Sequence, residues 1–123
     1  MATGYFLDTY AIIEFLNGNK KFEKYIDLEK NLTSTLNMIE LYYYLLSRHN
    51  EQIADDVTLP FSSISATPKL LTIKYAMKFR LEHRKMSLSY ADCIGYALAK
   101  EHGLKFLTGD KQFKGLPNVE YVR

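Results

Sequence analysis

The sequence is poor in cysteine and has no long apolar run. Cys93 is its single cysteine, which excludes an internal disulfide framework and suits a reducing cytoplasm. No apolar run approaches the ~20 residues that a membrane span needs, and the N-terminus lacks the charged-then-apolar pattern of a signal peptide. The sequence also shows no internal repeat, low-complexity segment or linker. We therefore expect a cytoplasmic protein that does not associate with membranes.

The composition is that of an ordinary globular domain. Of the 123 residues, 47% are apolar and 24% are charged, and a chain of this length can bury a core without disulfide staples. We therefore expect a single domain over residues 1–123. The net charge of +2 comes from 16 basic and 14 acidic side chains and by itself says little about partners.

The first 16 residues predict a buried strand that leads into a helix. Tyr5, Phe6 and Leu7 are apolar without alternation, which is typical of a strand covered on both faces in a parallel sheet. Asp8 follows at the carboxyl end of this strand, where open α/β sheets place their ligands. An aspartate here is also a common helix N-cap, so this position alone leaves both interpretations open.

Strands and helices alternate along the rest of the chain. We expect strands over residues 5–7, 31–35, 59–64, 105–107 and 119–122. We expect helices over residues 9–16, 21–29, 36–48, 51–57, 67–83 and 89–102, the last of them ending at Gly103. This alternation predicts an α/β domain.

Two of the expected helices carry informative apolar patterns. The helix over residues 36–48 is apolar almost all round, so we expect the sheet to cover one side and another helix or a partner chain to cover the other. In the helix over residues 67–83, an inward stripe is expected at Leu70, Ile73, Met77 and Leu81.

Four acidic residues fall where a strand gives way to a helix or a turn: Asp8, Glu40, Asp92 and Asp110. Each also has a structural explanation, because first-turn acids complement the helix dipole and Ser89 stands at capping-box spacing from Asp92. Taken together they belong to the same edge of an α/β sheet, where converging carboxylates repel one another unless a cation lies among them. Hard oxygen ligands suit Mg²⁺ or Mn²⁺, and phosphodiester hydrolysis is the reaction that such a site serves best.

Convergence of the four acids would also change the character of the surrounding surface. Only ten acidic side chains would remain elsewhere against 16 basic ones, and a basic surface beside an acidic pocket suits a polyanion. The basic cluster over residues 80–85 could meet the phosphates of such a polyanion or form a solvated helix end. The tyrosines at 42–44 are expected mainly in packing, with stacking on bases as the alternative. Cys93 is expected to be a buried, inert thiol.

Four short motifs carry a family resemblance: Phe6 to Thr9, Thr35 to Glu40, Leu88 to Cys93, and Phe106 to Lys111. In order and spacing they resemble the PIN domain family, and above all its small VapC-type toxins. The resemblance covers essentially the whole chain. It implies a three-layer α/β/α sandwich with a mostly parallel central sheet. It also implies a Mg²⁺- or Mn²⁺-dependent endoribonuclease, usually a homodimer, that is neutralised by a cognate antitoxin inserted into the active-site groove.

The resemblance assigns roles to particular residues. Asp8, Glu40, Asp92 and Asp110 match the acidic quartet that holds the metal, Thr108 matches the hydroxyl residue that supports the last acid, and Thr9 matches the small polar residue after the first. Gln112 departs from the pattern, because many relatives have a further acid there, which puts a second metal in doubt.

Four alternatives to a toxin nuclease can be weighed, and the sequence argues against the first two. A haloacid-dehalogenase-like phosphatase needs a second aspartate where this chain has Tyr10, and a receiver domain needs an acid pair that is not evident. An RNA-processing PIN nuclease without an antitoxin would share the same site. A binding or scaffold module would use the acids only as helix caps, and Mn²⁺ should then leave its melting temperature unchanged.

Overall fold

Five short parallel strands form the centre of the computed structural model, which describes residues 4–123. They are β1 (Tyr5–Leu7), β2 (Thr33–Ser34), β3 (Ser65–Ala66), β4 (Lys105–Thr108) and β5 (Val119–Tyr121). Strand β1 pairs with β4, β4 with β5, and β2 with β3, all in parallel. A parallel bridge between Phe6 and Leu32 joins the two groups. The order is therefore β3-β2-β1-β4-β5, as the prediction of a parallel sheet requires.

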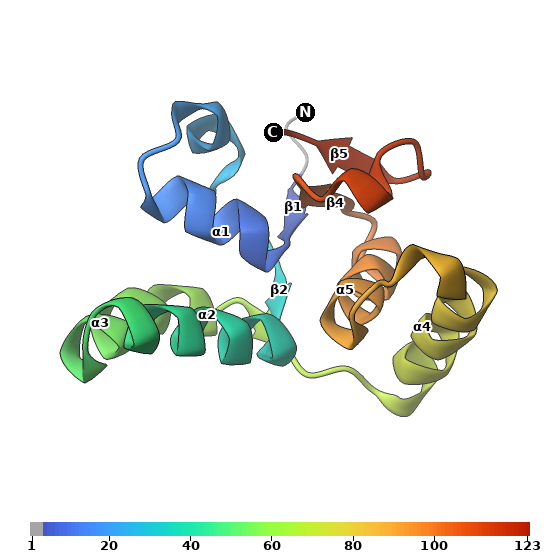
Figure 1. Cartoon of the computed structure of the whole chain (residues 1–123), viewed down its shortest axis with the longest axis horizontal. Helices are drawn as coiled ribbons and strands as arrows, with labels where there is room; N and C mark the ends of the chain where they lie inside the picture. Colours follow the sequence, from blue (N-terminus) through green and yellow to red (C-terminus); the bar gives the residue numbers. More distant parts are fainter. Residues whose placement is uncertain (1–3) are drawn as a thin grey trace.

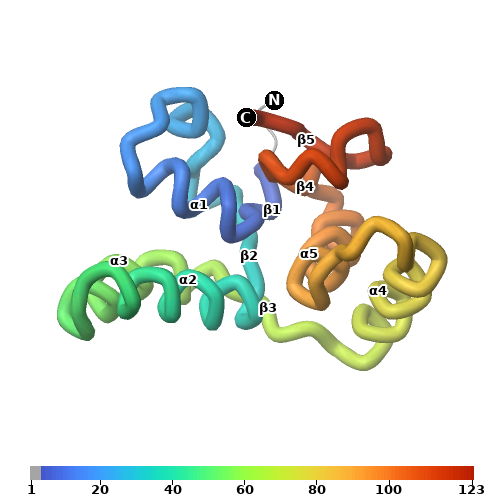
Figure 2. Tube along the Cα trace, in the orientation of Figure 1, coloured from blue at the N-terminus to red at the C-terminus, as the bar shows by residue number. Residues whose placement is uncertain are grey.

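Helices cover both faces of this sheet (Figure 1). One layer contains α1 (Thr9–Leu16), the 3₁₀ helix η1 (Lys20–Tyr25), α2 (Thr35–Arg48) and α3 (Glu51–Ser62). The other contains α4 (Leu70–Glu82) and α5 (Tyr90–Glu101). The short 3₁₀ turns η2 (Arg84–Met86) and η3 (Lys111–Phe113) pack on the same core. Figure 2 shows the connection after β3 that carries the chain from the first helical layer to the second.

The two faces of the sheet have separate hydrophobic cores, set by the alternation of side chains along β1 and β4. Phe6 and Phe106 pack in the core beneath α4 and α5, whereas Leu7 and Leu107 pack in the core beneath α1, α2 and α3. All four side chains are fully buried. Two covered faces and a parallel sheet confirm the predicted three-layer α/β/α architecture.

Helix α5 lies directly on the sheet because one of its residues is a glycine. A Cβ built on Gly95 would lie 2.7 Å from the ring of Phe6 and 2.9 Å from the ring of Phe106. Both rings are buried, so a side chain at this position would push the helix off the sheet. The close approach also fixes where the first turn of α5 lies relative to the strand ends.

Two of the expected elements are wrong. Residues 59–64 were expected to form a strand, but α3 continues to Ser62 with Pro60 inside it, and the edge strand β3 begins only at Ser65. Pro60 leaves the Asp56 carbonyl without its helical N–H donor, and the packing of α3 on α2 keeps this turn helical. The helix expected over residues 21–29 is the short 3₁₀ helix η1, which ends at Tyr25.

The apolar stripe expected on α4 is also wrong. Leu70 is 72% exposed and Leu81 is 64% exposed, whereas the buried residues of this helix are Thr72 and Ala76. Of the expected stripe, Met77 packs against the core. Small residues let α4 lie close to α5, and apolar periodicity does not reveal a contact of that kind.

Helix α2 is covered on one side. Leu41 and Leu45 are buried, while Ile39, Tyr43 and Leu46 are 61%, 73% and 44% exposed. Within the described residues, these three form an apolar stripe at helical spacing that no other element covers, which we call the α2 stripe. No helix of the described chain is long and apolar enough to cross a membrane.

Candidate active site

All four predicted acidic residues line one open pocket of about 520 Å³, together with Tyr10, Tyr43, Gly109 and Arg123 among others. The pocket lies where β1 and β4 end, and α1, α2 and the first turn of α5 contribute the rest of its lining. Parallel strands present their carboxyl ends at the same edge of a sheet, which is how residues far apart in sequence meet here. The sequence predicts these acids at one edge of the sheet, and in the structure all four line the same pocket.

Asp8 occupies the deepest position of the four and is only 6% exposed. Its Oδ1 accepts a 2.9 Å hydrogen bond from the Thr9 backbone N–H, and its Oδ2 accepts a 2.7 Å bond from the Thr108 hydroxyl. Burial, and then the neighbouring Asp92 carboxylate, raise the pKa of Asp8 from 3.8 to about 7. Asp8 is thus both the N-cap of α1 and a carboxylate held at an electrostatic cost in the pocket.

Thr108 connects the first and last acids of the pocket. Its buried hydroxyl donates to Asp8 and accepts a 3.1 Å hydrogen bond from the backbone N–H of Asp110. The Asp110 side chain in turn caps the turn η3, with Oδ1 accepting a 3.0 Å bond from the N–H of Gln112. Gln112 therefore contributes its backbone to this turn, and its side chain is outside the set that lines the pocket.

A chain of polar side chains, buried at Ser34 and Asn37, leads to the exposed Glu40, and most of it was not predicted from the sequence. Ser34 Oγ donates to Asn37 Oδ1 at 2.6 Å, and Asn37 Nδ2 donates to the Thr9 hydroxyl at 2.9 Å. That hydroxyl donates to Glu40 Oε1 at 2.5 Å. Asn37 is fully buried, so this chain ties the second turn of α2 to the start of α1. An asparagine one turn before Glu40 was the available signal, since both residues lie on the same helix face.

Asp92 has the capping role that was weighed against a site role, and it lines the pocket as well. Its Oδ2 accepts a 2.9 Å hydrogen bond from the Ser89 N–H, while the Ser89 hydroxyl accepts a 3.0 Å bond from the Asp92 N–H. This is a complete capping box at the start of α5. Burial is the main cause that raises the pKa of Asp92, and the Asp110 carboxylate adds to it.

The donor set of the pocket suits a hard divalent cation. Within residues 4–123 the single side-chain ion pair joins His102 and Glu101, so none of the four carboxylates is paired with a lysine or arginine. In Glu40, Asp92 and Asp110, one carboxylate oxygen accepts a hydrogen bond and the described residues supply none to the other. Oxygen ligands with free lone pairs are what Mg²⁺ and Mn²⁺ bind.

These side chains do not already surround one point. No group of three or more His, Cys, Asp or Glu side chains in the described part of the chain is close enough together to hold a metal ion. The carboxylates therefore fit a divalent cation by chemistry and location, and their outer groups have to turn inward to enclose one. Glu40 is exposed and held by one hydrogen bond, from the Thr9 hydroxyl, whereas Asp8 is buried and held by two.

Two further residues shape the rim and were not predicted. A Cβ on Gly109 would lie 2.2 Å from the ring of Tyr10 and 2.6 Å from the carbonyl oxygen of Val122, so only glycine fits between Thr108 and Asp110. Arg123 Nη1 donates a 3.1 Å hydrogen bond to the Gly109 carbonyl. This places a guanidinium at the edge of the acidic pocket without pairing it to a carboxylate.

Residues outside the pocket behave largely as structural groups. Cys93 is fully buried and its pKa is raised to about 11, mainly by burial, which agrees with the prediction of an inert thiol. In the basic cluster, Arg80 donates from Nε to the Leu88 carbonyl at 2.9 Å and lies over the ring of Tyr90. Arg84 and Lys85 of this cluster are exposed.

Comparison with known proteins agrees with this fold. The family model of the PIN domain matches residues 5–119, and the chain therefore belongs to the PIN domain family. No curated protein matches the sequence.

Among solved structures, the fold is similar to a toxin–antitoxin complex from Klebsiella pneumoniae, with a TM-score of 0.77 at 22% identity over 95% of this chain and 96% of that one. It is also similar to the sarcin-ricin loop cleaving toxin VapC20 from Mycobacterium tuberculosis, with a TM-score of 0.74 at 16% identity over 98% and 99% of the chains. A DNA-bound VapBC from Salmonella typhimurium gives 0.73 at 16% identity over 98% of both chains. At these identities the likeness establishes the fold.

Proposed function

We propose that this PIN domain is a Mg²⁺- or Mn²⁺-dependent endoribonuclease and the toxin of a toxin–antitoxin pair. The observation that carries the proposal is the pocket that Asp8, Glu40, Asp92 and Asp110 line together, where none of the four carboxylates forms an ion pair with a lysine or arginine of the described chain. If these carboxylates served only as helix caps, they would have no reason to line the same pocket. Membership of the PIN domain family, whose members are nucleases, also supports the proposal.

Within this proposal the four carboxylates hold the metal. Asp8 provides the fixed inner ligand, because Thr108 and the Thr9 N–H keep its orientation. Glu40 and Asp110 would provide further carboxylate oxygens for the ion. A bound divalent cation would supply activation of water and stabilisation of charge on the phosphate.

The surrounding residues position these ligands. Thr108 couples the Asp8 carboxylate to the turn that carries Asp110, so that the two move together. The chain through Asn37 and Thr9 sets the rotamer of Glu40. Arg123, at the rim, offers a cation to the phosphate of an incoming nucleotide. Supporting hydrogen bonds of this kind commonly change metal affinity by about 10- to 100-fold when they are removed.

Two partner proposals accompany the enzymatic one. Structural neighbours of this chain include a toxin–antitoxin complex and a DNA-bound VapBC, and we propose that this chain also has a cognate antitoxin. We further propose that the chain forms a homodimer and that the α2 stripe takes part, because its three apolar side chains are exposed at helical spacing.

The decisive experiment incubates the protein with structured and unstructured RNA in Mn²⁺, in Mg²⁺ and in EDTA. Asp8→Asn is the test variant, since it removes the charge and keeps the shape. Asp56→Asn is the matched control, because Asp56 lies on α3 and bonds only Gln52. We expect metal-dependent cleavage by the wild type and the control, and none by Asp8→Asn.

The outcomes separate the proposals. Cleavage by Asp8→Asn at the wild-type rate would show the catalytic assignment to be wrong. If no RNA is cut and Mn²⁺ leaves the melting temperature unchanged, the scaffold alternative is favoured, because a bound ligand stabilises the folded state.

A further inference from the structure

A second hollow, of about 770 Å³, adjoins the acidic pocket and is lined mainly by basic and aromatic side chains. It lies between η1 and the end of β5. We call it the cationic pocket, and its lining is Lys20, Lys21, Glu23, Lys24, Tyr25, Tyr121, Val122 and Arg123. Four of these residues are cationic and one is acidic, so the lining has a net positive charge, opposite to that of the neighbouring pocket.

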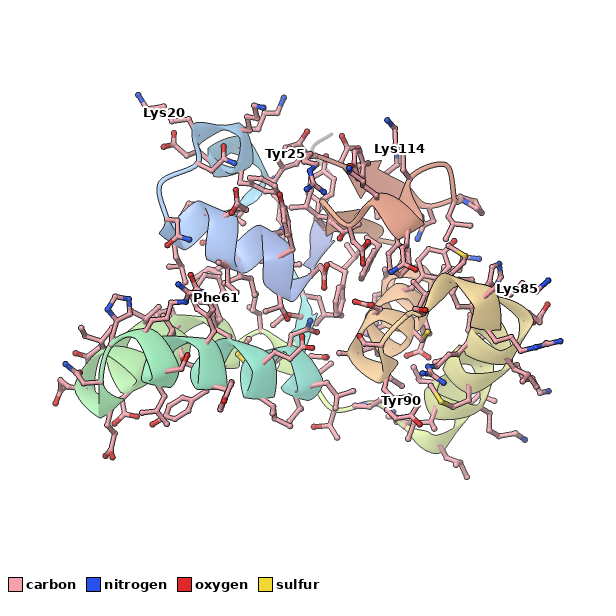
Figure 3. The ribbon with its side chains drawn as sticks, in the orientation of Figure 1. Lys20, Tyr25, Phe61, Lys85, Tyr90 and Lys114 are labelled. Atoms are coloured by element: carbon pink, nitrogen blue, oxygen red, sulfur yellow. The ribbon has the colours of Figure 1, made fainter. Side chains whose placement is uncertain are left out.

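Buried aromatic contacts fix the position of η1 beside the candidate active site. Phe22 is fully buried and its ring lies 6.0 Å from the ring of Tyr10, which itself lines the acidic pocket. Tyr25 packs edge-to-face on Tyr5 at 5.1 Å and donates from its hydroxyl to Glu120 at 3.2 Å. The lysines of η1 are therefore carried on an anchored element, and Lys20 projects from it into solvent (Figure 3).

Arg123 lines both pockets and joins them. Its side chain donates to the Gly109 carbonyl beside Asp110, and its main-chain oxygen accepts a 2.9 Å hydrogen bond from Lys21 Nζ. A row of positive groups thus runs from the rim of the acidic pocket to η1. Neither Lys20 nor Lys24 forms an ion pair with a described residue, and Lys24 Nζ lies 5.2 Å from the ring centroid of Tyr25, so neither charge is neutralised by a carboxylate.

We propose that the cationic pocket binds the sugar-phosphate backbone of a single-stranded RNA whose scissile phosphate lies in the acidic pocket. This inference rests on the proposed nuclease function and adds to it the direction in which the substrate strand leaves the site. Four clustered carboxylates repel a polyanion, so the strand needs compensating cations close by. Lysines supply phosphate contacts, while the exposed parts of Tyr25 and Tyr121 offer ring surface to an unpaired base.

Binding in EDTA tests the proposal without cleavage. We would measure fluorescence anisotropy of a labelled 12-nucleotide single-stranded RNA with the wild type, with Lys20→Ala/Lys24→Ala and with Lys74→Ala/Lys78→Ala. The last pair is the matched control, because it removes two exposed lysines from α4 in the opposite helical layer. We expect the test pair to weaken binding about tenfold or more at 0.1 M salt and to lower the salt slope by about 1.4.

A second variant separates charge from folding. Lys20→Arg/Lys24→Arg keeps both charges and should bind RNA as the wild type does. The proposal is overturned if the test pair and the control weaken binding equally, or if poly-glutamate of matched charge displaces the RNA more strongly than unlabelled RNA does, since the pocket would then be a site for an acidic peptide.

Cleavage with Mn²⁺ distinguishes the failure of this inference from the failure of the proposed function. If the wild type cuts RNA and the test pair cuts it with an unchanged KM, the nuclease proposal stands and the cationic pocket is not the path of the strand. If the wild type neither binds nor cuts RNA, both proposals fail.

Discussion

The Thr108 hydroxyl donates a 2.7 Å hydrogen bond to the Asp8 carboxylate, although the two residues are 100 positions apart in the chain. The bond links the ends of the adjacent parallel strands β1 and β4, and it lies in the interior. It gives the buried carboxylate one of its two hydrogen bonds and opposes the effect of burial on its pKa. Thr108 is therefore a positioning residue for the innermost acid of the pocket.

Replacing Thr108 with valine keeps the shape of the side chain and removes this hydrogen bond. We expect Thr108→Val to weaken Mn²⁺ binding by about 10- to 100-fold, because Asp8 loses its orientation and becomes harder to ionise. Isothermal titration with Mn²⁺ measures the change. Thr108→Ser keeps the hydroxyl and should bind Mn²⁺ nearly as the wild type does. Equal affinities of the valine variant and the wild type would show that Thr108 does not position Asp8.

The pKa of Asp8 makes the stability of the metal-free protein depend on pH. Because folding raises this pKa from 3.8 to about 7, the folded state binds the proton more tightly than the unfolded state. The contribution of Asp8 is therefore neutral below pH 4 and increasingly destabilising from pH 4 to pH 7. At pH 8 it lowers the free energy of unfolding by an amount on the order of a few kcal/mol.

Asp8→Asn should remove this dependence. In EDTA we expect urea unfolding to find the variant more stable than the wild type at pH 8, with a difference that is smaller at pH 5. With saturating Mn²⁺ at pH 8 the difference in unfolding free energy should shrink or change sign, because only the wild type is stabilised by the ion. A constant difference across the pH range would contradict the assignment of the raised pKa to Asp8.

The buried chain through Asn37 predicts a non-additive effect. Asn37→Ala leaves the hydroxyls of Ser34 and Thr9 without this partner, and we expect it to cost about 1–3 kcal/mol of unfolding free energy. Thr9→Val removes the next link of the same chain. Since the two changes disrupt one network, the double variant should lose less stability than the sum of the single variants. Chemical denaturation of all four proteins measures the coupling, and additivity would show that the chain does not act as a unit.

The α2 stripe predicts a change in assembly. We expect Ile39→Lys/Leu46→Lys to shift the protein from dimer to monomer, because charged side chains oppose burial in an apolar interface. Light scattering coupled to size-exclusion chromatography gives the mass. Leu81→Lys is the control, since Leu81 is equally apolar and 64% exposed but lies on α4. A dimer that survives the α2 substitutions would place self-association on another surface.

Local sequence patterns carried most of the information about the candidate site. Asp8 and Asp110 directly follow short apolar strands, and the spacing of Ser89 and Asp92 marks the start of a helix. These patterns fixed where each acid lies on its own element. The parallel order of the strands then required that the elements end at the same edge. What the patterns could not supply is the network between elements, such as the bonds of Asn37 to Ser34 and Thr9.

The wrong predictions for residues 59–64 and for α4 share one physical cause, which is tertiary packing. Residues 59–64 were expected to form a strand, but the packing of α3 on α2 keeps the chain helical as far as Ser62, despite the helical hydrogen bond that Pro60 cannot donate. On α4 the large side chains at Leu70 and Leu81 point outward, and small residues such as Ala76 make the contact with α5. Both depend on tertiary contacts, which override local pattern.

The capping box at Asp92 limits which substitutions could inactivate a homologue without unfolding the start of α5. One oxygen of this side chain accepts from Ser89 at the start of α5, and the same carboxylate lines the acidic pocket. A mutation to alanine or valine would therefore fray the helix at the same time as it emptied the site. Asparagine keeps an acceptor for the cap and gives up only the charge. An inactive homologue that still folds should therefore carry asparagine at this position, because the amide keeps the helix cap without the charge.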